Sequence, residues 1–374
     1  MELTFEKDEL LHALQMVQGV ASGRNTLPIL SNTLIRAQDG NIELAATDLE
    51  VGIRIKVVGT IKEEGATTVS AKKLVDIVRE LPDKPIEMVT TANDRIELTC
   101  GDGVYKIIGL SDEEFPELPS ADGEGVTIDG ETLCAVIRKT EFAASREEFR
   151  YYLNGLYFNL LEDKTEVVAT DAVRHLAMAH CAPFKTSEDV AGFIVPLKAV
   201  REIERTFADS PNVKILHLKN QILFADDNAT LMTRLVEGDY PPYQSIIPEA
   251  PEGRVVVPKE PFLRASRRVA LLSNPKNFSI CLDIDTEQIR ISAQTPELGE
   301  AFETLTVESG TGSVRIGFDA RVLTEILAHI ETESLVLEFS GEVSQVAVKP
   351  VGDDGHVCII MPMRLETSSQ SESE

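Results

Sequence analysis

The 374-residue sequence lacks long apolar segments, a secretion signal and any regular spacing of cysteines. No stretch reaches the about 18 consecutive apolar residues that a membrane-spanning helix requires. The first ten residues, MELTFEKDEL, carry acidic side chains and no apolar run, so we expect no signal peptide. The five cysteines are odd in number and widely scattered, and no pair has the close spacing of a zinc site. These absences favour a soluble cytoplasmic protein with reduced thiols and argue against a membrane protein or a secreted domain.

The sequence also lacks the common catalytic motifs. It contains no Walker A, GxSxG or HExxH motif, and its six histidines show no metal-ligand spacing. One enzyme hypothesis remains: a hydrolase or metal-dependent enzyme that uses Asp48 and Asp171, from two copies of an Ala-Thr-Asp segment. An aspartate at the end of a strand more commonly caps a turn through its side chain. We therefore predict no catalytic residue, no metal site and no cofactor.

Positive charge is scarce, because 36 Lys and Arg residues stand against 62 Asp and Glu, which gives a net charge of −26. This balance by itself argues against nucleic-acid binding, which depends on Lys and Arg contacts to phosphate. The basic residues nevertheless concentrate in segments with helical periodicity: Lys72, Lys73 and Arg79; Arg138 and Lys139; Lys198, Arg201 and Arg205; and Arg264, Arg267 and Arg268. Each cluster could be a solvated helix face, but recurrence at equivalent places of a repeat favours a shared basic lining that contacts a polyanion. The absence of zinc-finger, basic-zipper and RNP motifs indicates phosphate contacts without base reading.

The chain is predicted to contain three copies of one unit. Three landmarks recur in the same order: an opening helix (7–17, 131–140 and 259–272), a strand ending in a turn (42–50, 166–174 and 289–297) and a later helix (69–81, 195–207 and 316–330). Within the strand landmark, Ala46, Ala169 and Ala293 lie 123 and 124 residues apart, as tandem repeats require. We predict three domains of this repeat at 1–121, 126–248 and 254–365, followed by a disordered acidic tail at 366–374.

Each unit mixes two periodicities. Apolar residues at helical spacing, such as Leu10, Leu14 and Val17, predict the opening helix, and Leu323, Ile326 and Leu327 share one face of the last one. Between the helices, alternating strands are separated by turn signals at 37–41 and 91–95. The sequence therefore predicts an α+β protein with antiparallel sheets and with helices gathered on one side.

Several segments together resemble the β subunit of bacterial DNA polymerase III, the sliding-clamp family. They are GVASGRNTLPILSNTLI (19–35), ATDLE (46–50), FRYYLNGLYF (149–158), VATDAVRHLA (168–177), LVEGDYPPY (235–243), ALLSNPK (270–276) and MPMRL (361–365). The resemblance extends over residues 1–365, and RYYLNG and MPMRL are specific in combination. It implies the DNA-clamp fold, in which three-domain protomers form a head-to-tail homodimer that closes into a ring lined by helices.

The resemblance implies a non-enzymatic function. Such a ring encircles double-stranded DNA without sequence specificity and tethers the DNA polymerase III α subunit for processive synthesis. The clamp loader, other polymerases and repair proteins would dock on it through short peptide motifs. The alternative is a repeat scaffold that binds proteins only. Charge reversal at Arg201 and Arg205 distinguishes the two, because it would leave the function of a pure scaffold unchanged.

The resemblance and the charge pattern together predict three sets of functional residues. The DNA-binding set comprises Arg24, Lys72, Lys73, Arg79, Arg138, Lys139, Arg150, Tyr151, Tyr152, Lys198, Arg201, Arg205, Arg264 and Arg268. The partner-peptide pocket comprises Leu153, Thr170, Arg174, Leu176, Pro241, Ile246, Val343, Ile359, Met361, Pro362 and Met363. The dimer interface comprises Tyr105, Ile107, Leu271 and Leu272.

Each set has a simpler alternative. One of the two tyrosines could pack in the core, since adjacent strand residues face opposite sides. The MPMRL segment could be a last core strand, and the two leucines could belong to an ordinary helix core. The chain also departs from the family pattern at the pocket. His175 is an extra or substituted residue in the segment AVRHLA (172–177), and Ser245 stands where many family members have Arg. We therefore expect an altered ligand preference.

Overall fold

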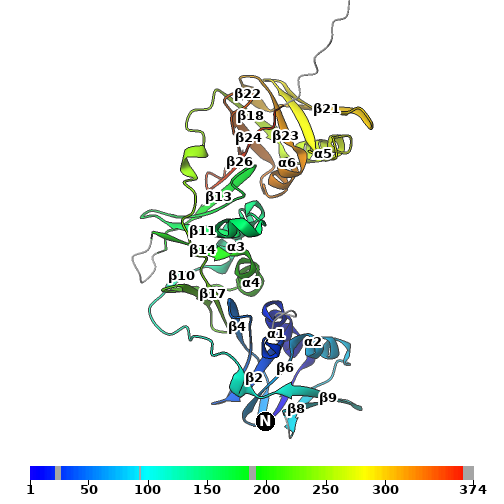
Figure 1. Ribbon diagram of the computed structural model, residues 1–374, viewed down its shortest axis with the longest axis vertical. Helices are drawn as coiled ribbons and strands as arrows, with labels where there is room; N and C mark the ends of the chain where they lie inside the picture. The colour runs from blue at the N-terminus through cyan, green and yellow to red at the C-terminus, as the bar shows by residue number, and fades with distance from the viewer. Residues whose placement is uncertain (22–26, 92–93, 185–190, 365–374) are drawn as a thin grey trace, which may run out of the picture. The chain divides into compact units, whose positions relative to one another are not determined.

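The computed structural model describes residues 1–21, 27–91, 94–184 and 191–364 (Figure 1). The chain forms two compact units. Unit 1 comprises Met1–Cys134, Phe184–Ala191 and Val195–Val236, and unit 2 comprises Ala135–Pro183, Gly192–Ile194 and Glu237–Glu374. The central predicted domain thus contributes to both units, and the three domain boundaries given above remain predictions. Arg24 and the acidic tail lie outside the described residues.

Six α-helices occur in the described parts of the chain, two from each predicted repeat. They are α1 (Lys7–Val20), α2 (Ala71–Glu80), α3 (Gly130–Arg138), α4 (Leu197–Phe207), α5 (Lys259–Ala270) and α6 (Ala320–Ala328). The opening-helix landmark corresponds to α1, α3 and α5, and the later-helix landmark corresponds to α2, α4 and α6. The predicted pairing of two helices per repeat is therefore confirmed. None of these helices is long and apolar enough to cross a membrane.

The strands follow the same repeat. The first repeat contains β1 (Glu2–Phe5), β2 (Asn32–Gln38), β3 (Asn41–Thr47), β4 (Val51–Lys56), β5 (Thr60–Glu63), β6 (Gly65–Ser70), β7 (Ile86–Thr91), β8 (Arg95–Cys100) and β9 (Gly103–Leu110). The second contains β10 (Val126–Ile128), β11 (Gly155–Leu160), β12 (Thr165–Thr170), β13 (His175–Cys181), β14 (Gly192–Pro196), β15 (Val213–Leu218), β16 (Gln221–Ala225) and β17 (Ala229–Arg234). The third contains β18 (Gly253–Pro258), β19 (Ser279–Ile284), β20 (Gln288–Thr295), β21 (Gly299–Thr306), β22 (Ser309–Thr311), β23 (Val314–Asp319), β24 (Ser334–Phe339), β25 (Val346–Pro350) and β26 (His356–Ile360). The strand landmark is β3, β12 and β20.

Antiparallel pairing joins neighbouring repeats into continuous sheets. In unit 1, β17 of the second repeat pairs with β4 of the first, with Leu231 opposite Ile53, inside a 13-stranded sheet. In unit 2, β13 of the second repeat pairs with β26 of the third, with Leu176 opposite Ile359, inside a nine-stranded sheet. Strands β21, β20, β19 and β23 form a separate four-stranded sheet. The predicted α+β class with antiparallel sheets is confirmed.

The helices are amphipathic because their sequences place apolar residues three and four positions apart. In α2, Leu74, Val75 and Val78 are buried, and the Ser70 hydroxyl caps the first turn by accepting a hydrogen bond from the Lys73 amide. In α4, Val200, Ile203 and Phe207 form the buried face. Burial of a side chain of this size stabilises the fold by roughly 1.5–3 kcal/mol relative to its exposure. The same packing fixes which residues of each helix reach solvent.

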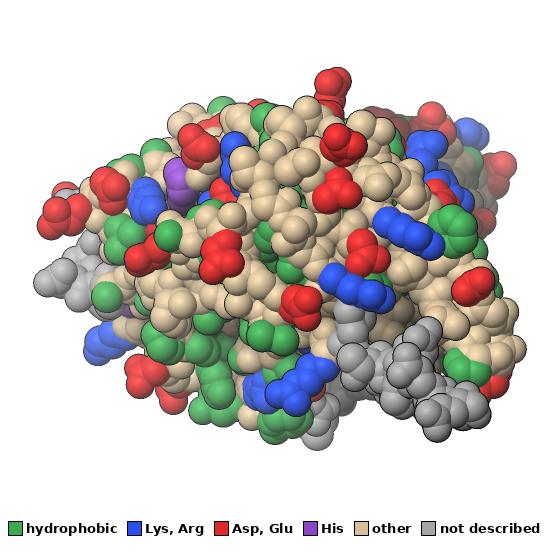
Figure 2. Space-filling view, turned by 90° about the horizontal axis from the view of Figure 1, so that it is seen from above, with side chains coloured by type: hydrophobic (Ala, Val, Ile, Leu, Met, Phe, Trp, Pro, Cys, Tyr) green, Lys and Arg blue, Asp and Glu red, His purple; other side chains and the backbone are tan. Residues whose placement is uncertain are grey.

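Charged side chains of both signs cover the surface. Figure 2 shows acidic and basic side chains interspersed over the face that it presents. No field of one sign covers that face, so any basic surface that binds a polyanion must be local. The ion pairs of individual helices therefore decide where positive charge remains available.

Candidate nucleic-acid and partner-protein interfaces

The basic residues of α2 share their helix with Asp76 and Glu80 but form no ion pair with them. Lys72, Lys73 and Arg79 are exposed on the side of α2 opposite its buried residues. Within the described residues, none of their side chains forms an ion pair. Arg79 lies in the last turn, where the partial negative charge of the helix end favours a cation. These three exposed side chains are therefore available to contact an external anion.

The α4 cluster is partly neutralised within unit 1. The Lys198 ammonium forms an ion pair with the Asp48 carboxylate, and an Arg205 guanidinium nitrogen lies 3.6 Å from a Glu202 carboxylate oxygen. Arg201 is exposed and has no ion-pair partner in the described parts of the chain. The predicted helix face therefore exists, but Arg201 supplies most of its uncompensated charge.

The clusters of α3 and α5 are engaged more strongly than the sequence suggested. The Lys139 ammonium donates to Asp353 at 2.7 Å, and Arg268 makes a bidentate ion pair with Glu303 at 2.7 and 2.6 Å. Arg264 donates to Glu260 at 2.6 Å within α5. Burial raises the pKa of Asp353, but the hydrogen bonds from Lys139 and the Gly355 amide, together with the Lys139 charge, outweigh it and lower that pKa overall. Lys139, Arg268 and Arg264 thus present less free charge than isolated residues would, and Arg138 is half-buried.

The predicted DNA-binding residues Arg150, Tyr151 and Tyr152 lie in the 3-10 helix η4 (Glu148–Leu153) rather than in a strand. Tyr151 is 58% exposed, whereas Tyr152 is half-buried and meets the Tyr151 ring edge-on at 5.8 Å between centroids. Arg150 donates to the Asp171 carbonyl at 3.0 Å, which holds the loop against the end of β12. Tyr152 is therefore partly covered, as the core alternative expected for one tyrosine, but neither tyrosine is fully buried. Sequence reasoning missed the neighbouring Phe149, whose ring is 73% exposed.

The predicted partner pocket consists of a buried floor and an exposed rim, all in unit 2. Leu153, Thr170, Leu176 and Ile359 are buried, and Leu176 and Ile359 share a core cluster with Ile246 packed against it. The rim contains Arg174, Val343 and Met361, with the half-buried Pro241, Pro362 and Met363. Residues 361–364 follow the end of β26 at Ile360 and are exposed or half-buried, so they are not a core strand.

Two backbone hydrogen bonds fix this rim. The Met361 amide donates to the Arg174 carbonyl at 2.8 Å, and the Met363 amide donates to the Gly317 carbonyl at 2.8 Å. A nearby cavity of about 320 Å³ is lined by Asp171, Arg174 and His175, and Arg174 is its one lining residue from the predicted pocket set. Strand pairing and these hydrogen bonds bring Arg174, Leu176, Ile359 and Met361 together.

The repeated aspartates cap turns, as the sequence predicted. Asp48 accepts hydrogen bonds from the Glu50 and Val51 amides at 2.9 and 2.7 Å, and Leu49, the residue after Asp48, has a φ of +76°. Asp171 accepts from three successive amides, at 173, 174 and 175, at 3.1, 2.8 and 3.2 Å. These contacts account for both carboxylates without any catalytic role.

The second of these turns is one residue longer than the first. The Thr47 hydroxyl donates to the carbonyl four residues ahead, whereas the Thr170 hydroxyl donates to the His175 carbonyl, five residues ahead. Arg174 points outward and its Nε donates to Asp171 at 2.7 Å, while the His175 ring is buried. Burial raises the pKa of Asp171, but the neighbouring His175 and Arg174 outweigh it and hold that pKa well below its ordinary value. This geometry favours Arg174 over His175 as the rim residue.

Several strand edges lack partners within the described residues, and two of them, on β9 and β21, carry exposed apolar residues. β9 pairs with β8 along its length but meets β6 only at Gly109 and Leu110. β21 pairs with β20 and forms the end of its sheet. Of the predicted interface residues, Tyr105 is exposed and Ile107 half-buried on β9, and Leu271 is 77% exposed at the end of α5, with Leu272 half-buried. The helix-core alternative is therefore wrong for Leu271.

Sequence reasoning missed further apolar residues on these edges. Val104 and Ile108 on β9 and Phe302 on β21 are exposed. The strands themselves could be predicted from local alternation. Whether a strand edge is paired depends on residues far away in the sequence, so the unpaired edges could not be predicted. Among the described residues, no three His, Cys, Asp or Glu side chains converge as a metal site.

Comparison with known proteins shows which family the chain matches. The chain matches the DNA polymerase III beta subunit N-terminal domain over residues 1–119, its central domain over 127–242 and its C-terminal domain over 244–364. It is 31% identical to the Beta sliding clamp of Pseudomonas putida over 372 residues, covering 98% of this chain and 100% of that protein. The Beta sliding clamp of Escherichia coli K12 is also 31% identical, over 369 residues, with the same coverage.

Solved structures give the same result. The sliding clamp of Pseudomonas aeruginosa bound to griselimycin superposes with a TM-score of 0.92 at 32% identity, covering 98% of this chain and all of that one. The DNA polymerase sliding clamp from Bacillus subtilis superposes with a TM-score of 0.91 at 27% identity, covering 98% of this chain and 99% of that one.

Proposed function

Because the chain belongs to the family of DNA polymerase III β subunits, we propose that it is a sliding clamp that encircles duplex DNA and holds a polymerase on its template. The observation that carries this proposal is the series of three consecutive β-subunit domains along one chain, in the order in which the family has them. The fold supports the same function, since each repeat supplies two helices and antiparallel strands.

Ring closure would use the unpaired edges of β9 and β21. β9 comes from the first repeat and β21 from the third, so each protomer offers two different edges. A contact between unlike surfaces is head-to-tail, and it generates a closed ring when the rotation between protomers closes. We propose that the exposed apolar residues of β9 pack against β21 and Leu271 of a second copy. Main-chain hydrogen bonds between the two edges would complete both sheets.

Contacts with DNA would be few and independent of sequence. Lys72, Arg79 and Arg201 are free to contact phosphates, and such contacts exchange readily because they read no base. A closed ring needs no tight contact, since DNA escapes only through an open interface or a free end. Tyr151 adds an exposed aromatic ring that could stack on an unpaired base. Retention by topology is compatible with rapid sliding and with the acidic character of the whole chain.

Partner proteins would dock at the rim of the unit 2 pocket. The exposed Val343 and Met361 at this rim offer apolar surface, and the flexible side chains of Met361 and Met363 can adapt to different peptides. The proposed partners are the DNA polymerase III α subunit, the clamp loader, and other polymerases and repair proteins, each through a short motif. Tethering raises the effective concentration of the polymerase at the template, so that dissociation becomes rare.

The clamp itself would catalyse no reaction. Asp48 and Asp171, the residues of the enzyme hypothesis, are occupied as turn caps. We also propose a cytoplasmic location, which the five free, buried cysteines support, because reduced thiols are typical of that compartment.

The test is primer extension on singly primed circular DNA with the cognate polymerase, clamp loader and ATP, and with competitor DNA that traps released polymerase. We expect long products in a single binding event only when the chain is present. Equal product lengths with and without it would contradict the clamp function. The double variant Arg201→Glu/Arg205→Glu tests the protein-only scaffold, which predicts products of wild-type length.

A further inference from the structure

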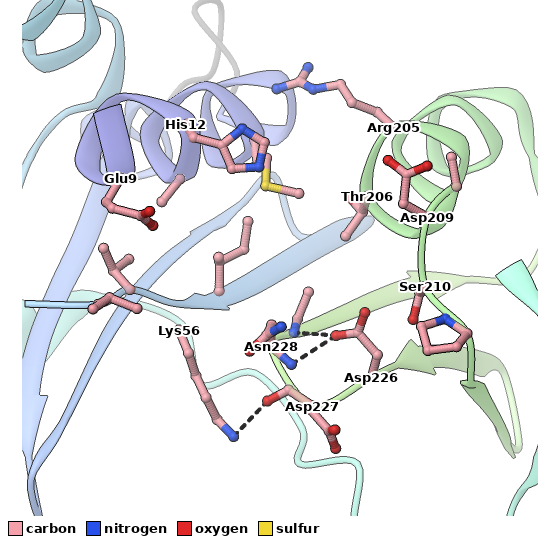
Figure 3. Close-up of a pocket in the computed structure, with 18 of the residues that line it drawn as sticks. Glu9, His12, Lys56, Arg205, Thr206, Asp209, Ser210, Asp226, Asp227 and Asn228 are labelled. Carbon is pink, nitrogen blue, oxygen red and sulfur yellow. Dashed lines mark hydrogen bonds between the residues drawn. The ribbon is translucent and has the colours of Figure 1, made fainter. Parts of the chain in front are cut away.

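A groove on unit 1 remains unexplained by these interfaces. It has a volume of about 580 Å³ and is lined by α1 and the end of β4 from the first repeat, and by α4 and the β16–β17 turn from the second (Figure 3). We call it the junction groove, because it lies where these two repeats meet within unit 1. Apart from Arg205, none of its lining residues belongs to the surfaces assigned above.

The junction groove has apolar surface open to solvent. Ala13 and Met16 line it from α1, and Val57 and Val58 line it from the segment after β4. Val58 is 75% exposed and Met16 is half-buried, so part of this surface has no cover in unit 1. A partner side chain that covered Val58 and Met16 would remove apolar surface from water, and this would favour binding.

The rim of the junction groove carries uncompensated negative charge. The carboxylates of Glu9, Asp209 and Asp227 have no ion-pair partner in the described parts of the chain, and Figure 3 shows Glu9 and Asp209 on opposite sides of the groove. The lining holds two basic residues, Lys56 and Arg205, against four acidic ones, since Asp226 lines it as well. The Lys56 ammonium donates to the Asp227 carbonyl at 2.8 Å, and Arg205 lies beside Glu202 at 3.6 Å.

We propose that the junction groove docks a short segment of a partner protein in which an apolar side chain stands beside a lysine or arginine. The apolar side chain would cover Met16 and Val58, and the cation would approach Glu9 and Asp209. Charge complementarity selects this occupant, because a nucleic-acid phosphate would meet uncompensated carboxylates and an acidic peptide would be repelled. The proposal is independent of the clamp function and of the pocket in unit 2.

The test uses the seven methionines as reporters. The full-length protein is labelled with ¹³C-methyl methionine, and resonances are assigned with Met→Leu variants. Met16 reports on the junction groove, and Met361 and Met363 report on the unit 2 pocket. The probe is the capped peptide Ala-Lys-Leu-Leu-Arg-Ala, and the comparison peptides are Ala-Glu-Leu-Leu-Glu-Ala and Ala-Lys-Ser-Ser-Arg-Ala. We expect saturable movement of the Met16 resonance with the first peptide and much weaker responses to the other two.

Charge variants then test the rim. Glu9→Gln combined with Asp209→Asn should weaken the first peptide about three- to tenfold, as expected for two exposed ion pairs. Asp8→Asn is the matched control, since Asp8 is exposed on the same helix turn but does not line the groove. If the double variant fails to fold, Asp227→Asn alone should give a smaller weakening of the same sign. An unmoved Met16 resonance, equal responses to all three peptides, or a response confined to Met361 and Met363 would overturn the proposal while leaving the clamp function untouched.

Discussion

At single positions, ion pairs within the chain decide how much positive charge is left for DNA. Lys139 and Arg268 are bound to Asp353 and Glu303, whereas Arg201 and Arg79 have no such partner in the described residues. Basic residues with the same formal charge therefore differ in how much of that charge remains available to DNA in the folded protein. The sequence could identify the helix faces from spacing, but it could not identify these partners, because Asp353 lies 214 residues from Lys139.

The first prediction concerns Arg201. Arg201→Glu should weaken loading and processivity at moderate salt, because it replaces an unpaired cation with an anion on the face proposed to contact phosphate. The defect relative to wild type should shrink as salt is raised, because the lost contact is electrostatic and salt screens it. Arg234→Glu is the control, because Arg234 is also exposed but lies at the end of strand β17. Equal defects in both variants, measured by single-binding-event primer extension, would remove the specific role of α4.

The second prediction concerns pH and His356, a buried residue of β26. Burial first, and repulsion from the Lys139 ammonium next, lower the pKa of His356 from 6.5 to about 4. The unfolded chain therefore binds a proton in a pH range where the folded chain does not. The stability that depends on neutral His356 is fully present above pH 6.5 and is lost as pH falls towards 4.

At pH 5 the loss should be about 2 kcal/mol relative to pH 7.5. His356→Gln should remove this component from the pH dependence, even if it lowers stability at every pH. Hydrogen exchange of peptides covering β26 in urea measures it, with His12→Gln, an exposed histidine, as control. The nearby Asp353 has a lowered pKa, so its contribution is lost only below the ordinary value of 3.8, outside this window. An unchanged pH slope in His356→Gln would contradict the assignment.

At the scale of elements, the repeat was readable from the sequence because each landmark is local. Helix spacing, strand alternation and a capped turn are set by residues within about ten positions of one another. Pairings such as β17 with β4 and β13 with β26 join distant residues, and they produce the sheets that span two repeats. For the same reason the unpaired edges of β9 and β21 could be recognised only in the fold.

The third prediction addresses these edges. Leu271→Asp and Ile108→Asp should each give monomers at concentrations where the wild type is dimeric, because a charge would be buried in the proposed seam. Sedimentation equilibrium measures the association. Leu218→Asp is the control, since Leu218 is also an exposed apolar residue but lies at the end of β15, away from both edges. Wild-type dimers in the Leu271 and Ile108 variants would rule out this seam.

The fourth prediction separates partner docking from ring formation. Val343 is 75% exposed at the rim of the unit 2 pocket, so Val343→Asp should leave the fold and the dimer intact. It should weaken a labelled peptide from the cognate polymerase α subunit by about tenfold, since a charge replaces apolar contact. Fluorescence anisotropy gives the affinity, and Val351→Asp, at an exposed turn after β25, serves as control. Unchanged peptide affinity would show that Val343 lies outside the pocket.

At the scale of the whole molecule, function would depend on topology more than on any single contact. A net charge of −26 is compatible with holding DNA only if a few local basic residues contact it and closure prevents escape. The family resemblance could be stated from short segments such as RYYLNG and MPMRL, and the matches to three consecutive β-subunit domains confirm it. The junction groove had no comparable signal, because its two sides come from different repeats.

Retention on DNA tests the central claim most directly. The chain is loaded onto nicked circular DNA by its clamp loader with ATP, the salt is raised, and half of the sample is linearised with a restriction enzyme. We predict that the protein stays on the circles at high salt and is lost from the linear DNA, because only a ring can slide off an end. Equal retention on circular and linear DNA, or loss from both, would contradict a closed sliding clamp.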